Sequence, residues 1–208
     1  RSIAHDVSSP LITGMTIATL IKKALKNQKY DLITDYVNSL EQCNAQAIQD
    51  IDITLSSIKV DNNIKPKDWG NYPIKTCITE ALNNFQMTSE QKNRVTYITN
   101  KNDKDFRFTG SPTLMRHIIF NLLKNAFKYA GTEAKIEIYI KNKKLHIKDN
   151  GHGINPKVMK LLFQKNITTD GYGIGLNFCK EAMFKMNGTI ECKSKKGFGA
   201  EFILSFNN

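Results

Sequence analysis

The first 65 residues of this 208-residue chain contain a single glycine, and their apolar residues recur at spacings of mostly three and four. This periodicity places apolar side chains along one stripe of an α-helix. The polar string at 27–31 interrupts it, which predicts two amphipathic helices joined by a short turn. The stripe positions are Ile3, Val7, Leu11, Gly14, Ala18, Ile21 and Leu25, then Leu32, Tyr36, Leu40, Cys43, Ala47, Ile48, Ile51, Leu55 and Ile58.

A lone pair of such helices cannot bury both stripes. A second copy of the chain would complete a four-helix bundle, so we expect an antiparallel hairpin that forms a homodimer.

The second part of the chain has a different pattern. The polar, proline-containing stretch at 61–70 predicts a linker, which divides the chain into a hairpin at 1–60, the linker, and a domain at 71–208. In that domain, helical patterns near 73–86, 112–130, 156–164 and 174–187 alternate with β-rich runs near 95–99, 105–109, 134–141, 144–149, 189–193 and 200–206. The pattern predicts an α+β fold, with helices on one face of a mixed sheet.

The charge, the apolar runs and the cysteines of the sequence limit the kinds of binding partner and cellular location that we expect. The net charge of +11 is carried by many lysines, which we interpret mainly as solvated surface positions. Because no basic stripe is interleaved with aromatic residues, we expect no nucleic-acid partner. No run of 18 apolar residues is present, the four cysteines lack metal-type spacing, and residue 1 is Arg1 rather than Met. We therefore expect a cytoplasmic piece of a longer protein with reduced thiols.

One histidine stands out on the first predicted helix. His5 lies two residues from Ile3 and two from Val7, so it points away from the apolar stripe. Asp6 follows it directly, and Pro10 removes the hydrogen bond to the carbonyl of Asp6. A neutral imidazole is a competent nucleophile near pH 7, and a carboxylate that holds one ring nitrogen leaves the other to attack.

Polar residues also follow one face of the predicted helix at 112–130. Asn121, Asn125, Lys128 and Tyr129 are spaced by four, three and one. Asparagine is a weak helix former, so two of them on one face indicate a function. Their carbonyl oxygens are hard neutral ligands that suit Mg²⁺, while Lys128 is able to neutralise phosphate charge and Tyr129 to lie against a base.

Two glycine clusters follow. Asp149, Gly151 and Gly153 come at the end of a predicted strand, where a carboxylate is placed to accept a hydrogen bond from an exocyclic amine. Glycines 171, 173 and 175 precede a predicted helix, an arrangement that presents backbone N–H groups to phosphates.

Together these motifs, in this order, resemble those of bacterial sensor histidine kinases. The segment His5-Asp6-x-x-x-Pro10-Leu11 resembles the phosphoacceptor box, and Asn121-x-x-x-Asn125-Ala126-x-Lys128-Tyr129 resembles the asparagine box. The glycine clusters are similar to the first two glycine boxes, and 197–202 resembles the third, which we interpret as support for a lid at 164–172. The ATP-binding domain of this family is shared with type II topoisomerases and heat-shock chaperone ATPases, which place Glu at the position of Asn121.

The resemblance implies a catalytic core that uses ATP and Mg²⁺ to phosphorylate His5 and then passes the phosphoryl group to an aspartate of a response regulator receiver domain. The resemblance implies that Asp6 takes the proton from His5 and that the residue at the position of Ser9 helps to dephosphorylate the response regulator. It also implies that Asn125, together with Asn121, binds Mg²⁺. The ATP site that it implies consists of Asn121, Asn125, Lys128, Tyr129, Asp149, Gly151, Gly153, Ile154, Phe163, Thr169, Gly171, Tyr172, Gly173, Ile174, Gly175 and Leu176.

Two alternatives remain open on the sequence alone: a degenerate kinase that acts as a dimeric docking module for a regulator, and an ATPase of the same fold. The resemblance further implies that a membrane is reached only through a sensor region preceding residue 1, so the expected location is the cytoplasmic side of an inner-membrane sensor.

Overall fold

The structure is a computed structural model that describes residues 2–61, 66–99, 105–133, 135–164 and 174–207. The chain forms two compact units, Arg1–Ile58 and Lys59–Asn208. No helix in the described ranges is long and apolar enough to cross a membrane.

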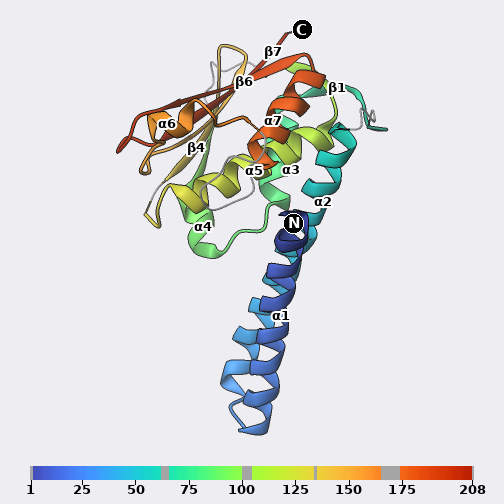
Figure 1. Ribbon diagram of the computed structural model, residues 1–208, viewed down its shortest axis with the longest axis vertical. Coiled ribbons are helices and arrows are strands. Elements are labelled where there is room, and N and C mark those ends of the chain that lie inside the picture. Colours follow the sequence, from blue (N-terminus) through green and yellow to red (C-terminus); the bar gives the residue numbers. More distant parts are fainter. Residues whose placement is uncertain (1, 62–65, 100–104, 134, 165–173, 208) are drawn as a thin grey trace. The chain divides into compact units, whose positions relative to one another are not determined.

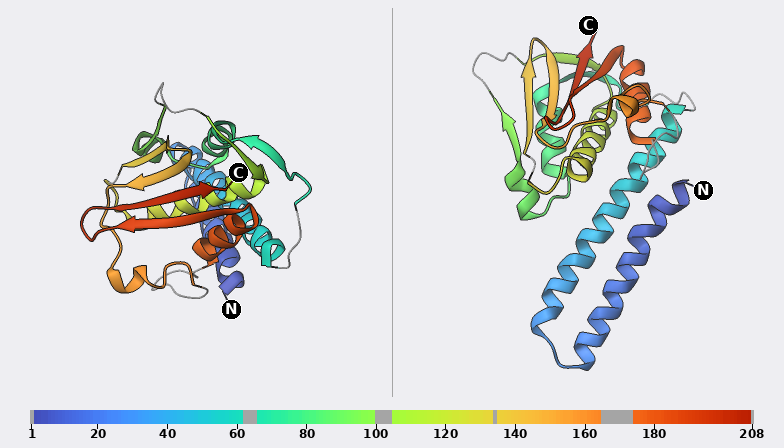
Figure 2. Two further views of the ribbon diagram at one scale, coloured as in Figure 1. Left: turned by 90° about the horizontal axis from the view of Figure 1, so that it is seen from above. Right: turned by 60° about the vertical axis from the view of Figure 1, so that its left-hand side comes forward.

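The first unit is a helical hairpin, as the periodicity predicts. Helices α1 (Ser2–Lys26) and α2 (Asp31–Asp61) run antiparallel, as the right-hand view of Figure 2 shows. Helix α1 continues without a break across Pro10. It ends where Gln28 takes a φ of 56° and the N–H of Lys29 donates to the carbonyl of Ala24. This tight reversal sets α2 alongside α1.

Several apolar side chains of this hairpin face solvent, beside the predicted stripe on α1 and on the stripe itself on α2. Met15 is 73% exposed and Ile12 is 62% exposed on α1, and Ile48 is 62% exposed on α2. Burial of such side chains is worth about 1.5–3 kcal/mol each. The four-helix bundle stays a prediction, and these residues are the surface that a second copy would cover.

The second unit is built on a mixed five-stranded sheet, as predicted. Strand β2 (Val95–Ile98) pairs in parallel with β4 (Ile136–Lys141). The other pairs are antiparallel and complete the order β2-β4-β5-β7-β6. The remaining strands are β5 (Lys144–Asp149), β6 (Gly188–Ser194) and β7 (Ala200–Phe206). A two-residue turn joins β4 to β5, with φ of 53° at Asn142 and 57° at Lys143.

Helices cover one face of this sheet (Figures 1 and 2). They are α3 (Ile74–Asn84), α5 (Pro112–Tyr129) and α7 (Ile174–Lys185), with α5 packed between the other two. Alternate strand residues point into this layer, so Ile136, Ile138 and Leu145 are fully buried. The core therefore holds α5 against the sheet.

Shorter elements differ from the sequence prediction. Strand β1 (Gly70–Pro73), paired with β3 (Arg107–Gly110), and helix α4 (Ser89–Arg94) were not predicted. Strand β1 is too short to show alternation, and α4 depends on a capping box between Thr88 and Gln91. The helix predicted at 156–164 was too long: α6 (Pro156–Met159) gives way to turns whose hydrogen bonds span three residues.

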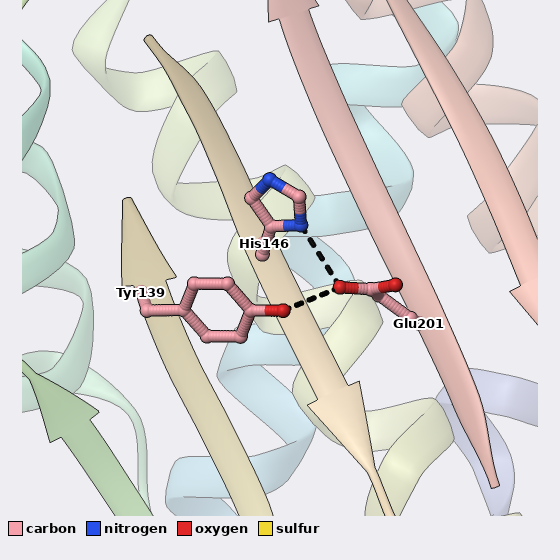
Figure 3. Close-up of polar contacts among 3 residues, drawn as sticks. All are labelled: Tyr139, His146 and Glu201. Carbon is pink, nitrogen blue, oxygen red and sulfur yellow. Dashed lines mark hydrogen bonds and ion pairs between the residues drawn. The ribbon is translucent and has the colours of Figure 1, made fainter. Parts of the chain in front are cut away.

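A polar cluster lies on the sheet, on the side of the strands opposite the core residues (Figure 3). Tyr139 on β4 donates to Glu201 Oε1 on β7 over 2.5 Å, and His146 on β5 donates from Nδ1 to the same oxygen over 2.9 Å. The Tyr139 and His146 rings stack with centroids 4.7 Å apart. Burial alone raises the pKa of Glu201, but the two hydrogen bonds, with the charges of His146 and Lys148, bring it below its ordinary value. The cluster ties three strands together.

Candidate nucleotide-binding site

Helix α5 carries the predicted asparagine pair. Its start is fixed by two groups: Ser111 Oγ accepts from the N–H of Leu114, and Asp68 accepts from Ser111 Oγ at 2.7 Å and from the N–H of Thr113 at 3.1 Å. These partners satisfy N–H groups that a helix start leaves unpaired. The helix is thereby anchored at its beginning, and Asn121 and Asn125 follow at fixed positions along it.

The two asparagines have different surroundings. Asn121 is buried, and its Nδ2 donates to the carbonyl of His117 over 2.9 Å. Asn125 is partly exposed, while Lys128 and Tyr129 near the helix end are exposed, with Lys128 Nζ 4.9 Å from the centre of the Tyr129 ring. The polar face therefore runs from the interior towards solvent along α5.

Asn121 also contacts the start of α7. A Cβ added to Gly175 would lie 2.4 Å from Asn121 Oδ1, closer than real Cβ atoms approach. Only glycine fits here, so the second glycine cluster contacts the asparagine helix directly. Leu176 follows in the first turn of α7 and is partly buried.

Asp149 is the last residue of β5 and is 8% exposed. Its Oδ1 accepts from the N–H of Gly151 at 2.9 Å and from that of Ala200 at 3.3 Å. Burial raises the pKa of its carboxyl group, and the two backbone N–H groups offset part of that rise. Both hydrogen bonds fall on Oδ1, so the carboxylate is held in one orientation with Oδ2 on its other side.

The loop after Asp149 touches the end of α5. A Cβ on Gly151 would lie 2.2 Å from the carbonyl oxygen of Ala130, so only glycine allows this approach. Gly153 has a φ of +68°, and the N–H of Ile154 donates to Ser194 Oγ at 2.8 Å. The loop is thus placed between α5 and the turn that joins β6 to β7.

Several predicted site residues lie outside the described part of the chain. These are Thr169, Gly171, Tyr172 and Gly173, together with the side chain of Ile174, whose backbone begins α7. Phe163 is described and lies, partly buried, in the turns after α6. The predicted lid at 164–172 lies outside the described residues except for residue 164, so its support by residues 197–202 stays a prediction.

The predicted catalytic residues are on the first unit. His5, Asp6 and Ser9 all belong to α1, but their side chains are not among those described.

Sequence reasoning missed several residues that shape the loop. Ser194 bonds to it, Gly199 packs against Asp149, and Arg94 donates from Nη2 to the carbonyl of Gly131 at 2.6 Å, next to His152. Ser194 carried no sequence signal because it occupies an ordinary strand position. Gly199 lay in the third glycine motif, which was assigned to a lid rather than to this loop.

The residues present fit a purine nucleotide and a hard cation. A buried, oriented carboxylate with a raised pKa is costly for the folded chain unless a ligand uses it, and an exocyclic amine is a suitable donor for Oδ2. Gly151, Gly153 and Gly199 let the loop after Asp149 pack closely against neighbouring backbone, which fixes the surroundings of this carboxylate. Asn125 is partly exposed, and an amide oxygen is the kind of neutral ligand that Mg²⁺ uses together with water and phosphate.

Comparison with known proteins agrees with this geometry. Residues 110–208 match the family described as histidine kinase-, DNA gyrase B-, and HSP90-like ATPase. The chain as a whole is related to sensor histidine kinases. It is 30% identical over 98% of its length to the CAI-1 autoinducer sensor kinase/phosphatase CqsS of Vibrio cholerae, and 24% identical over 99% to the histidine protein kinase SaeS of Staphylococcus epidermidis.

The matches cover only part of the length of these relatives. The chain spans 32% of the length of CqsS and 61% of that of SaeS. Among solved structures, the Acinetobacter baumannii histidine kinase AdeS is similar over 100% of both chains, with a TM-score of 0.62 and 18% identity. Full-length ShkA in complex with AMPPNP is similar over 98% of this chain and 45% of that one, with a TM-score of 0.57 and 15% identity. At such identities these structures establish the fold.

Proposed function

We propose that the chain is the catalytic core of a sensor histidine kinase, which uses Mg-ATP to phosphorylate its own His5. The observation that carries the proposal is the contact of three motifs around α5: Gly175 against Asn121, and Gly151 against Ala130 with Asp149 at the head of the same loop. Three segments that lie far apart in the sequence therefore meet at α5. They bring the oriented carboxylate of Asp149 and the start of α7 close to the asparagine pair that α5 carries.

In this proposal Asp149 Oδ2 accepts from the exocyclic amine of adenine, and the glycines of the 149–154 loop let the base lie on the backbone. Asn125 and Asn121 would hold Mg²⁺, which would spread the phosphate charge. Lys128 and the start of α7 complement the phosphates, and Thr169, Gly171, Tyr172 and Gly173 supply backbone around them.

The chemical step involves His5. One imidazole nitrogen forms a bond to the γ-phosphorus, the bond to the bridging oxygen breaks, and ADP leaves with that electron pair. Asp6 takes the ring proton or keeps the imidazole in the reactive tautomer. Most of the acceleration comes from positioning and charge stabilisation, since phosphoryl transfer requires little covalent participation by the protein.

The partners follow from the same proposal. The phosphoryl group passes from His5 to an aspartate of a receiver domain on a response regulator, and Ser9 would orient the water that later hydrolyses the phosphoaspartate of that regulator. The exposed apolar residues of the hairpin are the surface for a homodimer. A sensor region preceding residue 1 would link this cytoplasmic core to a membrane.

A labelling experiment tests the proposal. The chain is incubated with Mg²⁺ and γ-labelled ATP, and acid-labile label on the protein is followed in the parent, in His5→Gln and in His146→Gln. We expect label on the parent and on His146→Gln, because His146 lies in the sheet cluster away from α5, and none on His5→Gln.

The two alternatives give different results in the same experiment. Binding of ATP without label on the parent would indicate a docking module. Release of free phosphate that is unchanged in His5→Gln would indicate an ATPase. Either result would exclude the kinase proposal.

A further inference from the structure

The turn between β6 and β7 packs directly on the loop that follows Asp149. Ser194, the last residue of β6, makes two hydrogen bonds: its Oγ donates to the carbonyl of Gly199 over 2.6 Å and accepts from the N–H of Ile154 over 2.8 Å. A hydroxyl carries one hydrogen and two lone pairs, so it performs both roles at once. One side chain therefore joins the two ends of its own turn and links that turn to the loop.

Close backbone contacts make this junction rigid. A Cβ on Gly199, which has a φ of +83°, would lie 2.0 Å from the carbonyl oxygen of Asp149. A Cβ on Gly153 would lie 2.2 Å from the carbonyl oxygen of Lys195, and the N–H of Gly197 donates to the carbonyl of His152 at 2.7 Å. With no side chain between the two backbones, a shift of the turn shifts the loop.

The same junction holds the Asp149 carboxylate. Its Oδ1 accepts from Ala200, the residue after Gly199, and from Gly151 inside the loop. Ser194 fixes the carbonyl of Gly199 on one side and the N–H of Ile154 on the other. The direction of Oδ2 thus depends on the Ser194 hydroxyl, although the two residues are not hydrogen-bonded to each other.

We propose that Ser194 is a positioning residue that sets the base selectivity of the site, through the orientation it imposes on Asp149. This inference rests on the proposed function, because it requires Asp149 to face the base. It predicts a specific loss: without the hydroxyl, the site still holds triphosphate but no longer distinguishes a purine amine from a purine carbonyl.

The test compares the dissociation constants of ATP and ITP, which carries a carbonyl in place of the amine, for the full chain in the presence of Mg²⁺. Ser194→Val and Ser194→Thr have the same shape and differ in the hydroxyl alone. We expect Ser194→Val to weaken ATP binding about tenfold while ITP binding changes less, since the part-buried hydrogen bonds to Ile154 and Gly199 that orient Asp149 are lost. Ser194→Thr should keep the ATP preference.

A matched control lies on the same hairpin. Ser205 on β7 is at the end of the strand pair remote from Ser194, and its Oγ has no hydrogen-bond partner among the described residues. Ser205→Ala should leave both dissociation constants unchanged.

Three outcomes would contradict the inference. A Val variant that keeps the ATP preference, or one that loses ATP and ITP binding equally, overturns the role of Ser194 while leaving the proposed function in place. A parent chain that binds neither nucleotide overturns the proposed function and the inference together. Should Ser194→Val fail to fold, amide exchange in the parent decides: an Ile154 N–H that exchanges as fast as that of an exposed loop would show that the Ser194 bond is not made.

Discussion

Gly175 and Asn121 lie in direct contact, with space for a hydrogen atom and not for a methyl group between Gly175 Cα and Asn121 Oδ1. The amide cannot simply turn away, because its Nδ2 is bound to the carbonyl of His117. The start of α7 and the middle of α5 are therefore fitted to each other through one buried polar side chain.

Gly175→Ala should destabilise the chain by about 1–3 kcal/mol, because the added methyl group forces α7 away from α5. Urea unfolding measures the change. Gly14→Ala is the matched control: its Cβ would meet nothing closer than Leu40 Cδ1 at 3.4 Å, and alanine favours a helix interior. Equal loss of stability in both variants would contradict the predicted clash.

Asp149→Asn should have opposite consequences for the stability of the fold, which it should keep, and for ATP affinity, which it should lower. Because burial raises the pKa of Asp149 above 3.8, the protonated form is favoured by folding. That contribution to stability is present below the unfolded pKa and is lost as the pH rises through the folded pKa. A neutral amide whose oxygen still accepts from Gly151 and Ala200 should therefore leave the chain at least as stable at pH 7.

The same variant should weaken ATP binding at least about tenfold, since an amide oriented in this way presents its NH₂ group to the amine of the base. Thermal unfolding and nucleotide titration on one sample measure both effects. Loss of stability together with unchanged ATP affinity would assign Asp149 a structural role.

Asp68 should stabilise the start of α5 in a pH-dependent way. Its burial raises the pKa, but hydrogen bonds from Thr113 and Ser111 outweigh this, and the pKa is lowered from 3.8. The contribution is present above the unfolded pKa and is lost as the pH falls through the folded pKa. Asp68→Ala should cost about 1 kcal/mol at pH 7, and the cost should decrease as the pH is lowered below 3.8, as measured by urea unfolding. A cost that does not change with pH would exclude the carboxylate as the cause.

These examples show which features are predictable from the sequence. Asp149, Asn121 and Asn125 are detectable because their residue types are unusual at regular positions on predicted elements. The hydrogen bond between Asp68 and Ser111 spans 43 residues, and that between Ile154 and Ser194 spans 40. No local pattern encodes such pairings, because they follow from the order of strands in the sheet. Strand β1 went unnoticed for the same reason, since its four residues are defined by their pairing with β3.

Glu201 should make the sheet sensitive to acid. Its pKa is lowered overall from 4.5, so its stabilising contribution is present above that value and is lost as the pH falls through the folded pKa. Glu201→Gln should cost about 1 kcal/mol at pH 7, because the hydrogen bonds from Tyr139 and His146 then end on a neutral amide oxygen instead of a carboxylate. Urea unfolding at pH 7 and at pH 3.5 measures this change. A Glu201→Gln chain with the same pH profile as the parent would contradict the prediction.

Met15→Glu should convert a dimer into a monomer. Met15 is 73% exposed in one chain, and a charge at this position would have to be desolvated in a four-helix bundle. Sedimentation equilibrium measures the mass. Phe184→Glu places the same charge at another apolar residue, 76% exposed on α7, and should leave the mass unchanged. A parent chain that sediments as a monomer would exclude the bundle.

The tight turn at Asn142 and Lys143 has a consequence for the order of folding. Both residues adopt positive φ, the geometry that matches the natural twist of two adjacent strands. Strands β4 and β5 can therefore pair with almost no loop to close. The parallel pairing of β2 with β4 must first bring together residues 41 positions apart, such as Val95 and Ile136. The β4–β5 hairpin, which ends in Asp149, is expected to nucleate the sheet, and its edge strand β2 to join late.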